Sequence, residues 1–261
     1  MTALRRPFRS PAFRTIVLAS LALPLALGLA ACNSGSGDAA GASGDVVENV
    51  APPAGSFWSG VATRTPDGGW LVGNPDAPIK LIEYGSLTCP ACALFSTEGS
   101  AKLHSDYVDT GRVSYEFRTV LIHGAIDLLM SRVLECAPVN VAVPLAEQGW
   151  ANLDEVTAPF QANQAALEAA ISLPEDQRFV AMAQAGGLDA FYAARGISTE
   201  QTQACLADSA AVTALATKSQ EMSTRDGVTG TPTFLLNGTK VDATRWAEVE
   251  GALQRAGART E

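Results

Sequence analysis

Two cysteines in the stretch EYGSLTCPACALF, Cys89 and Cys92, are separated by two residues. Such a pair can bind a metal, close a structural disulfide, or exchange electrons with another protein's thiols. A structural zinc site needs about four ligands. The sequence has no second pair of this spacing, and neither His104 nor His123 has ligand-like spacing to the cysteines. A structural disulfide would close only a tiny loop, which limits its entropic benefit. The residue types therefore favour redox chemistry.

The position of the pair sharpens this interpretation. An apolar run at 79–86 predicts a buried strand, and a helix is predicted from Cys89 to about Val108, with Leu94, Phe95 and Leu103 in the core. At a helix N-terminus the unpaired N–H groups and the dipole stabilise a thiolate. Cys89, nearest this end, is the predicted nucleophile, and Cys92 lies one turn later on the same face. Pro90 suits a first turn, where its missing N–H costs nothing.

The elements around the pair alternate between strand and helix character. Strands are predicted within 68–78, 79–86 and 112–122, and in a hairpin over 231–242 that turns at Asn237-Gly238. A final helix is predicted from the apolar spacing of residues 244–257. Residues 124 to about 222 are rich in Ala, Leu, Gln and Glu with helical spacing. The chain is therefore predicted to be an α/β protein with a helical insertion.

One segment of the insertion carries an explicit start signal. Ser198 followed by Gln201 is a capping-box pattern, which predicts a helix that continues to about Met222.

The N-terminal residues are typical of an export signal. Four arginines and no acid precede an apolar run of 16 residues, Ile16 to Ala31, which is shorter than the roughly 20 residues of a membrane-spanning helix. The run ends in Leu29-Ala30-Ala31-Cys32, which resembles the lipobox of bacterial lipoproteins. Cys32 would then become the lipid-modified first residue of the mature protein. Asn33 after it favours the outer membrane by the sorting rule of enteric bacteria, and a chance cysteine after an ordinary signal peptide is the alternative.

Residues 33–56 are small, polar and nearly free of large apolar side chains, so we expect a flexible tether. Removing residues 1–31 changes the formal net charge from −9 to −13, a balance that argues against a nucleic-acid-binding surface. The predicted organisation is a signal peptide (1–31), a lipid anchor and tether (32–62), a core in two parts (63–123 and 223–261), and a helical insertion between them (124–222).

Taken together, these features resemble the thioredoxin superfamily, and its DsbA-like branch in particular. The resemblance covers roughly residues 66–257. It rests on Glu83 in the strand before the pair, on Cys89-Pro90-Ala91-Cys92 at a helix start, on the helical block, and on the segment Gly230-Thr231-Pro232-Thr233-Phe234.

The resemblance implies a thioredoxin-like fold with a helical insertion and a thiol–disulfide oxidoreductase that needs no cofactor. It implies a cis peptide bond at Pro232, with Thr231 and Pro232 beside the cysteines and in contact with substrate. Glu83 would be a buried acid with a raised pKa that exchanges a proton with Cys92 through water; a surface glutamate is the alternative. The expected partners are thiols or disulfides of exported proteins, a membrane redox protein, and the lipid membrane that Cys32 enters, on the periplasmic side of the envelope.

Two residues depart from the most oxidising members of the branch. Ala91 replaces a histidine, which predicts a less stabilised Cys89 thiolate, and Thr231 replaces a valine. The chain could therefore introduce disulfides, or act as a reductase or isomerase. An alternative of another class is a tethered peptide-binding module or holdase, in which Leu87, Leu94 and Phe95 would matter more than the thiols.

If Cys32 is lipidated, four cysteines remain. As in some DsbA-like proteins, Cys136 and Cys205 are expected to form a structural disulfide within the insertion; two buried thiols are the alternative.

Overall fold

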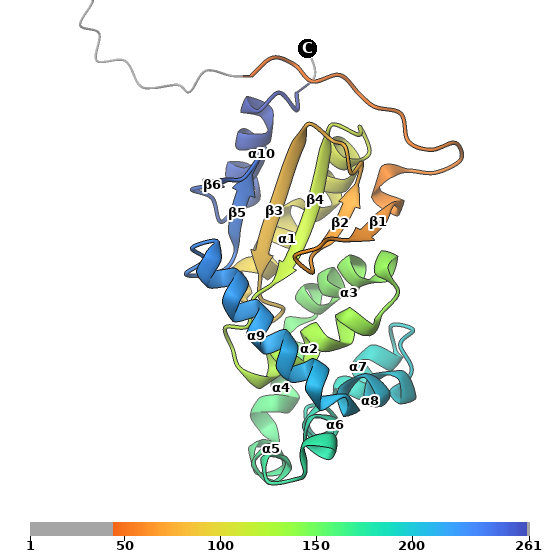
Figure 1. The fold of residues 1–261 in the computed structure, drawn as a ribbon, viewed down its shortest axis with the longest axis vertical. Helices are drawn as coiled ribbons and strands as arrows, with labels where there is room; N and C mark the ends of the chain where they lie inside the picture. The colour runs from red at the N-terminus through yellow and green to blue at the C-terminus, as the bar shows by residue number, and fades with distance from the viewer. Residues whose placement is uncertain (1–43, 260–261) are drawn as a thin grey trace, which may run out of the picture. The chain divides into compact units, whose positions relative to one another are not determined.

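The computed structural model describes residues 44–259. The predicted signal peptide, Cys32 and the first part of the predicted tether lie outside this range. Within it, six strands form one mixed sheet in the order β1-β2-β4-β3-β5-β6 (Figure 1). The strands are β1 (Ala62–Arg64), β2 (Trp70–Gly73), β3 (Ile79–Gly85), β4 (Val113–Thr119), β5 (Thr233–Leu236) and β6 (Thr239–Val241).

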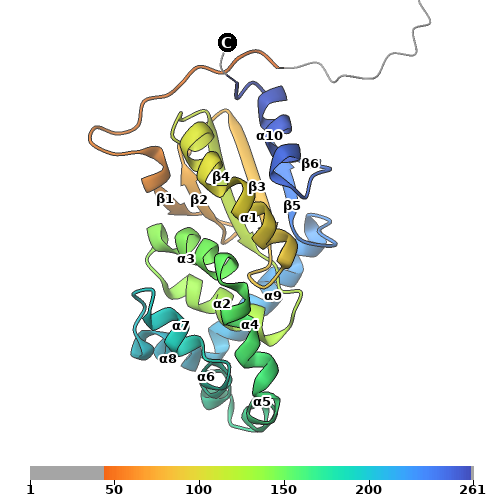
Figure 2. The same ribbon diagram turned by 180° about the vertical axis from the view of Figure 1, so that it is seen from behind.

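Only β3 and β4 pair in parallel, and the other neighbouring strands are antiparallel. The crossover between the parallel strands runs through α1 (Pro90–Lys102) and the π-helical turn η2 (Leu103–Val108), which lie on the face of the sheet seen in Figure 2. The C-terminal helix α10 (Trp246–Arg255) packs against α1. All the predicted strands are present; the short β1 is additional.

The period of two along β3 divides its side chains between the two faces. Ile79, Leu81 and Glu83 point toward the α1 side, where the first two belong to the main hydrophobic core. Ile82 and Tyr84 belong to a smaller cluster on the opposite side. The sheet therefore carries Glu83 under the helix that starts at the cysteine pair.

The hairpin β5–β6 turns at Asn237 and Gly238, whose φ angles are 49° and 80°. Positive φ at both central residues is the requirement of a type I′ turn, and Asn-Gly is the sequence that meets it most readily. The Asn237 side chain also accepts a hydrogen bond of 2.8 Å from the Lys80 backbone N–H, which extends the pairing of β5 with β3. The turn thus fixes the register of the strand that follows Pro232.

The helical insertion lies between β4 and β5 and fills the lower half of Figure 1. Its helices are α2 (Ala125–Cys136), α3 (Val139–Ala151), α4 (Leu153–Ala162), α5 (Gln164–Ile171), α6 (Glu175–Ala185), α7 (Leu188–Ala193), α8 (Thr199–Ala207) and α9 (Ser209–Arg225). Cys136 and Cys205 form a disulfide that joins the end of α2 to α8. The insertion ends at Arg225, a few residues beyond the predicted boundary.

The segment from Ser198 to Met222 contains two helices where the sequence analysis predicted one. The capping box of Ser198 and Gln201 starts α8 as expected. The helix then breaks at Asp208, whose carboxylate accepts a hydrogen bond of 3.0 Å from the N–H of Ala211. An aspartate that caps a new helix competes with continuation of the old one, and this second start signal was not recognised in the sequence.

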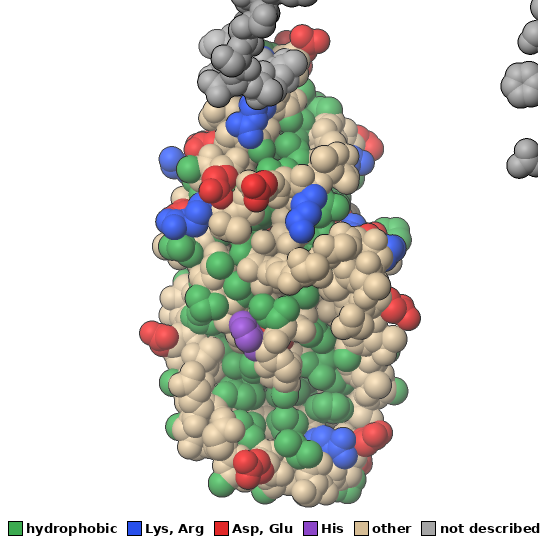
Figure 3. Space-filling model, turned by 90° about the vertical axis from the view of Figure 1, so that its left-hand side faces the viewer, with side chains coloured by type: hydrophobic (Ala, Val, Ile, Leu, Met, Phe, Trp, Pro, Cys, Tyr) green, Lys and Arg blue, Asp and Glu red, His purple; other side chains and the backbone are tan. Residues whose placement is uncertain are grey.

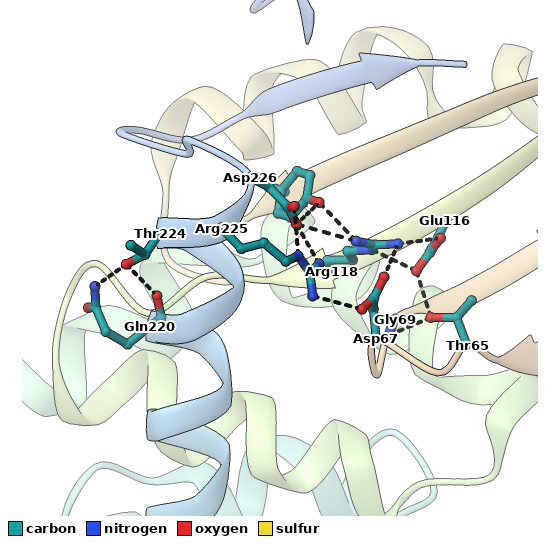
Figure 4. Close-up of polar contacts among 10 residues, drawn as sticks. Thr65, Asp67, Gly69, Glu116, Arg118, Gln220, Thr224, Arg225 and Asp226 are labelled. Carbon is teal, nitrogen blue, oxygen red and sulfur yellow. Dashed lines mark hydrogen bonds and ion pairs between the residues drawn. The ribbon is translucent and has the colours of Figure 1, made fainter. Parts of the chain in front are cut away.

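Arg118 of β4 connects the sheet to the end of α9 (Figure 4). Its guanidinium binds Glu116 at 2.7 Å and Asp67 at 3.0 Å, and donates to the Tyr84 hydroxyl at 2.9 Å. Tyr84 in turn donates to Asp226 at 2.7 Å. Because Asp226 directly follows α9, this cluster fixes the point from which the chain runs to Pro232.

The C-terminal part of the predicted tether, residues 44–62, makes hydrogen bonds to the rest of the domain. The N–H groups of Val47 and Val50 donate to Gly257 O and Thr110 O at 3.0 and 2.9 Å. Trp58, in the short helix η1 (Trp58–Gly60), is 8% exposed, and its indole donates to Val50 O at 2.7 Å. Backbone hydrogen bonds and one aromatic side chain hold a segment whose composition alone suggested a free chain.

Candidate active site

The cysteine pair lies where β3 meets α1. Cys89 is the N-cap residue of α1, with φ −79° and ψ 120°, and Pro90 takes the first helical position. The Cys89 N–H donates to Ser86 O at 3.2 Å, which closes the turn between strand and helix. Cys89 and Cys92 are thiols, 5% and 0% exposed. The structure therefore represents the reduced pair.

The two thiols differ sharply in acidity. A hydrogen bond from the Cys92 side chain lowers the pKa of Cys89 to about 5 against the opposing effect of burial, helped by the Thr231 side chain and by the backbone N–H groups of Cys92 and Ala91. Burial, followed by the same hydrogen bond, raises the pKa of Cys92 far above its usual range. Since the thiolate is the attacking form, Cys89 has the properties of a nucleophile and Cys92 those of a partner that stays protonated.

The segment before β5 approaches the pair from the other end of the sequence. The Thr231–Pro232 peptide bond is cis, as the resemblance implied. The Cys89 thiol donates to the backbone carbonyl of Thr231 at 3.3 Å. The fold thus places Thr231 and Pro232 directly beside Cys89, although 142 residues separate Thr231 from it.

Glu83 is fully buried on the α1 side of β3. Its Oε2 accepts a hydrogen bond of 2.7 Å from the Tyr115 hydroxyl, and its Oε1 has no partner among the described residues. Burial raises the pKa of Glu83 to about 8, opposed by the Tyr115 hydrogen bond and supported by the negative charges of Glu147 and Cys89. The predicted burial and the predicted direction of the pKa shift are both present.

Three further residues of the site were not found in the sequence analysis. Asp127, fully buried in the first turn of α2, accepts hydrogen bonds from the hydroxyls of Ser86 and Thr88 at 2.9 and 2.7 Å. It also accepts from the backbone N–H groups of Ile122 and His123. Asp127 therefore fastens the loop before Cys89 to the loop before α2. The available signal was an acid within the apolar run AIDLL, which is costly to bury unless it is hydrogen-bonded.

Neither histidine is placed to bind a metal ion together with the two thiols. His104 pairs with Glu147 at 2.9 Å, and His123 contacts Thr88. In residues 44–259 no group of three or more His, Cys, Asp or Glu side chains is arranged to bind a metal ion. None of the helices in this range combines the length and hydrophobicity that crossing a membrane requires.

Comparison with known proteins places this geometry in a family. A family model described as thioredoxin matches residues 65–255, most of the chain. The chain belongs to the thioredoxin family. Within that family its solved relatives include a protein-disulfide isomerase from Novosphingobium aromaticivorans, 26% identical, with a TM-score of 0.64 over 70% of this chain and 94% of that one. The α-DsbA1 of Wolbachia pipientis, 19% identical over 74% of this chain and 92% of that one, has the same fold at a TM-score of 0.59.

Curated relatives match over a shorter stretch. The disulfide bond formation protein D of Bacillus subtilis is 35% identical over 54 residues, which is 21% of this chain and 24% of that protein. A putative protein-disulfide oxidoreductase of Rickettsia bellii is 38% identical over 48 residues, 18% of each chain. The chain thus aligns with about a quarter or less of these relatives.

The fold also corrects the predicted core position of Leu94, one of three apolar residues near the pair. Phe95 is in the core as predicted, and Leu87 is buried as well, whereas Leu94 is 41% exposed. Leu94 follows Cys92 by two positions, which turns it away from the helix face that packs on the sheet. Of these three side chains, only Leu94 is accessible to a bound peptide.

Proposed function

We propose that this protein is a DsbA-like thiol–disulfide oxidoreductase that introduces disulfides into exported proteins through Cys89 and Cys92. The observation that carries the proposal is the placement of Cys89 at the N-terminus of α1, beside the cis Thr231–Pro232 segment. A Cys89 pKa lowered to about 5 agrees with this placement. Such a thiolate is a good leaving group and a stable product.

In the first step a substrate thiolate attacks Cys89 of the oxidised pair. A substrate–Cys89 disulfide forms, the Cys89–Cys92 bond breaks, and the electron pair goes to Cys92. Cys92 then takes a proton, for which the buried carboxyl group of Glu83 is the proposed donor. In the second step another substrate thiolate attacks the substrate sulfur and releases the Cys89 thiolate.

The same acidity supports the oxidising direction of electron flow. A low Cys89 pKa stabilises the reduced form, which makes the disulfide form oxidising. Ala91 provides no cation to the thiolate, but hydrogen bonds from the Cys92 side chain and from the backbone N–H groups of Cys92 and Ala91 favour it instead. The alternative is a reductase or isomerase, which is favoured by the threonine at position 231 and by the similarity to the protein-disulfide isomerase of Novosphingobium aromaticivorans.

The deciding experiment measures the reduction potential of the pair against glutathione and the oxidation of reduced ribonuclease. An oxidase is expected to have a potential nearer the roughly −120 mV of DsbA than the roughly −270 mV of thioredoxin. Cys89→Ala is expected to abolish the reaction, and Cys92→Ala to trap substrate as a mixed disulfide at Cys89. Full activity of Cys89→Ala would falsify the proposal.

A binding module or holdase is the second candidate. Its one favourable observation is the exposed Leu94 beside the pair. It predicts that Cys89→Ala suppresses aggregation of an unfolded client as well as the wild type does, while Leu94→Ser loses this effect.

We further propose that the protein acts on the periplasmic side of the envelope, anchored through Cys32 and reoxidised by a membrane redox protein. The support is the lipobox-like stretch that ends at Cys32. Metabolic labelling with a fatty acid is expected to mark the wild type and to be lost in Cys32→Ala. An unlabelled wild type, recovered from the periplasm in soluble form, contradicts the anchor but leaves the redox function intact.

A further inference from the structure

His123 is connected to the buried Asp127 through the hydroxyl of Thr88. Thr88 donates its hydroxyl proton to Asp127 at 2.7 Å, and His123 Nδ1 lies 2.8 Å from the same oxygen. Because a hydroxyl has only one proton to donate, His123 must donate through Nδ1–H. This arrangement fixes the tautomer of the neutral ring and leaves Nε2 as a proton acceptor.

The imidazole of His123 lines a hollow next to the turn that carries Cys89. The hollow has a volume of about 380 Å³, and its lining includes Thr88, Pro90 and His123. Thr88 and Pro90 are the two neighbours of Cys89 in the sequence, so His123 borders a hollow that adjoins the turn carrying the nucleophile. Its side chain is 48% exposed, so it can meet a solute.

The remaining walls of the hollow suit a polypeptide segment. Ile126, Leu153 and Phe160 supply apolar surface, and Asp154 is the acid in the lining. Figure 3 shows hydrophobic side chains gathered over the lower half of one face, at the height of the helical insertion, with a histidine at the upper border of that area. A cysteine in an apolar segment is the kind of substrate that this surface would accept.

We propose that His123 is the general base that takes the proton from the incoming substrate thiol. The inference rests on the proposed oxidase function. The substrate S–H bond breaks and its proton moves to His123 Nε2. The substrate sulfur bonds to Cys89, and the electron pair of the Cys89–Cys92 bond goes to Cys92. His123 returns its proton to solvent. Thr88 and Asp127 act as positioning residues that hold the ring in the accepting tautomer.

The charged and titratable groups around His123 come from three elements. Asp127 on α2 lies 3.9 Å from Nδ1, Asp154 on α4 lines the same hollow, and Cys89 begins α1.

The test compares two thiols that differ in ionisation. Oxidised wild type and His123→Gln are mixed at neutral pH with N-acetylcysteine, an alkyl thiol that is mostly protonated, and with 2-nitro-5-thiobenzoate, an aromatic thiol that is already ionised. Mixed-disulfide formation is followed by rapid acid quench. The variant is expected to react with the alkyl thiol about a hundredfold more slowly, the lower end of general-base effects, and with the aromatic thiolate at the wild-type rate.

A matched pair of variants tests the positioning role. Thr88→Val removes the hydroxyl at nearly constant volume and is expected to slow the alkyl thiol selectively, whereas Thr88→Ser keeps the hydroxyl and the rate. An equal loss with both thiols in His123→Gln, or no loss with either, overturns the inference. If instead wild type and Cys89→Ala behave alike, it is the proposed function that fails.

Discussion

The acidity of Cys89 depends on one neighbour more than on any other. The Cys92 thiol donates to the Cys89 thiolate, and this hydrogen bond is the largest cause of the lowered Cys89 pKa. Titration of the reduced protein, followed by thiolate absorbance, should therefore show a midpoint near pH 5. In Cys92→Ala the midpoint should rise toward the ordinary thiol value, because the donor is gone. An unchanged midpoint in that variant would assign the acidity to the helix and to Thr231 instead.

Whereas the charged form of Cys89 is stabilised, the charged form of Glu83 is disfavoured by burial. Its pKa is raised from 4.5 to about 8, so between these pH values the folded protein holds a proton that the unfolded chain has released. Stability must then fall as the pH rises through this window. Glu83→Gln removes the penalty, and we expect it to stabilise the reduced protein by about 3 kcal/mol at neutral pH.

Urea unfolding of both proteins across the pH range measures this effect. The two free energies of unfolding should converge below pH 4.5, the value from which the Glu83 pKa is raised. A constant difference at every pH would mean that the glutamine acts through packing and not through titration.

At the scale of elements, a local sequence pattern predicted the observed structure wherever that pattern is compatible with only one structure. The Asn237-Gly238 turn, the Ser198–Gln201 capping box and the run 79–86 all gave the observed elements. The helix break at Asp208 was missed because a capping residue inside an apolar pattern looks like an ordinary polar position. Leu94 was misplaced because residue type alone does not say which face of a helix a side chain occupies.

In the candidate site, too, the local sequence predicted some residues and not others. Cys89, Cys92 and Glu83 are close in sequence, so one strand–helix junction predicts their proximity. The Thr231–Pro232 segment required the family resemblance, because nothing local connects it to Cys89. Asp127 gave only a weak signal, since its significance depends on Ser86 and Thr88 arriving from another part of the chain.

The disulfide joins two elements whose contact the sequence does not encode locally. Cys136 and Cys205 close a loop with a sequence separation of 69. Constraining a loop of this size in the unfolded chain stabilises the folded state by about 4 kcal/mol in the chain-entropy model. Cys136→Ala/Cys205→Ala should lose this amount in urea unfolding.

The double variant should nevertheless keep the wild-type reduction potential, because the disulfide lies at the opposite end of α2 from Asp127, the residue that contacts the loop before Cys89. A shifted potential would reveal that the insertion strains or positions the redox pair, and would contradict this separation.

At the scale of the whole molecule, the polar segment before β1 is part of the domain from residue 44 onward. Within this segment the Trp58 side chain is 8% exposed, whereas the preceding Phe57 is 73% exposed. Because these adjacent aromatic residues have opposite environments, substituting each of them by alanine gives a matched pair of variants. Trp58→Ala removes a buried ring and its hydrogen bond to Val50, so we expect a loss of about 3 kcal/mol, near the lower end for buried aromatic truncations.

Phe57→Ala should change stability by less than about 0.5 kcal/mol, as is usual for exposed positions. Thermal unfolding of both variants decides whether this segment stabilises the domain or merely rests against it. If the segment is a free tether, as its composition suggested, the two substitutions will have equal and negligible effects. A loss confined to Trp58→Ala instead means that a chain cut near residue 62, at the start of β1, is a destabilised domain, because it discards the backbone hydrogen bonds of Val47 and Val50 together with the Trp58 ring.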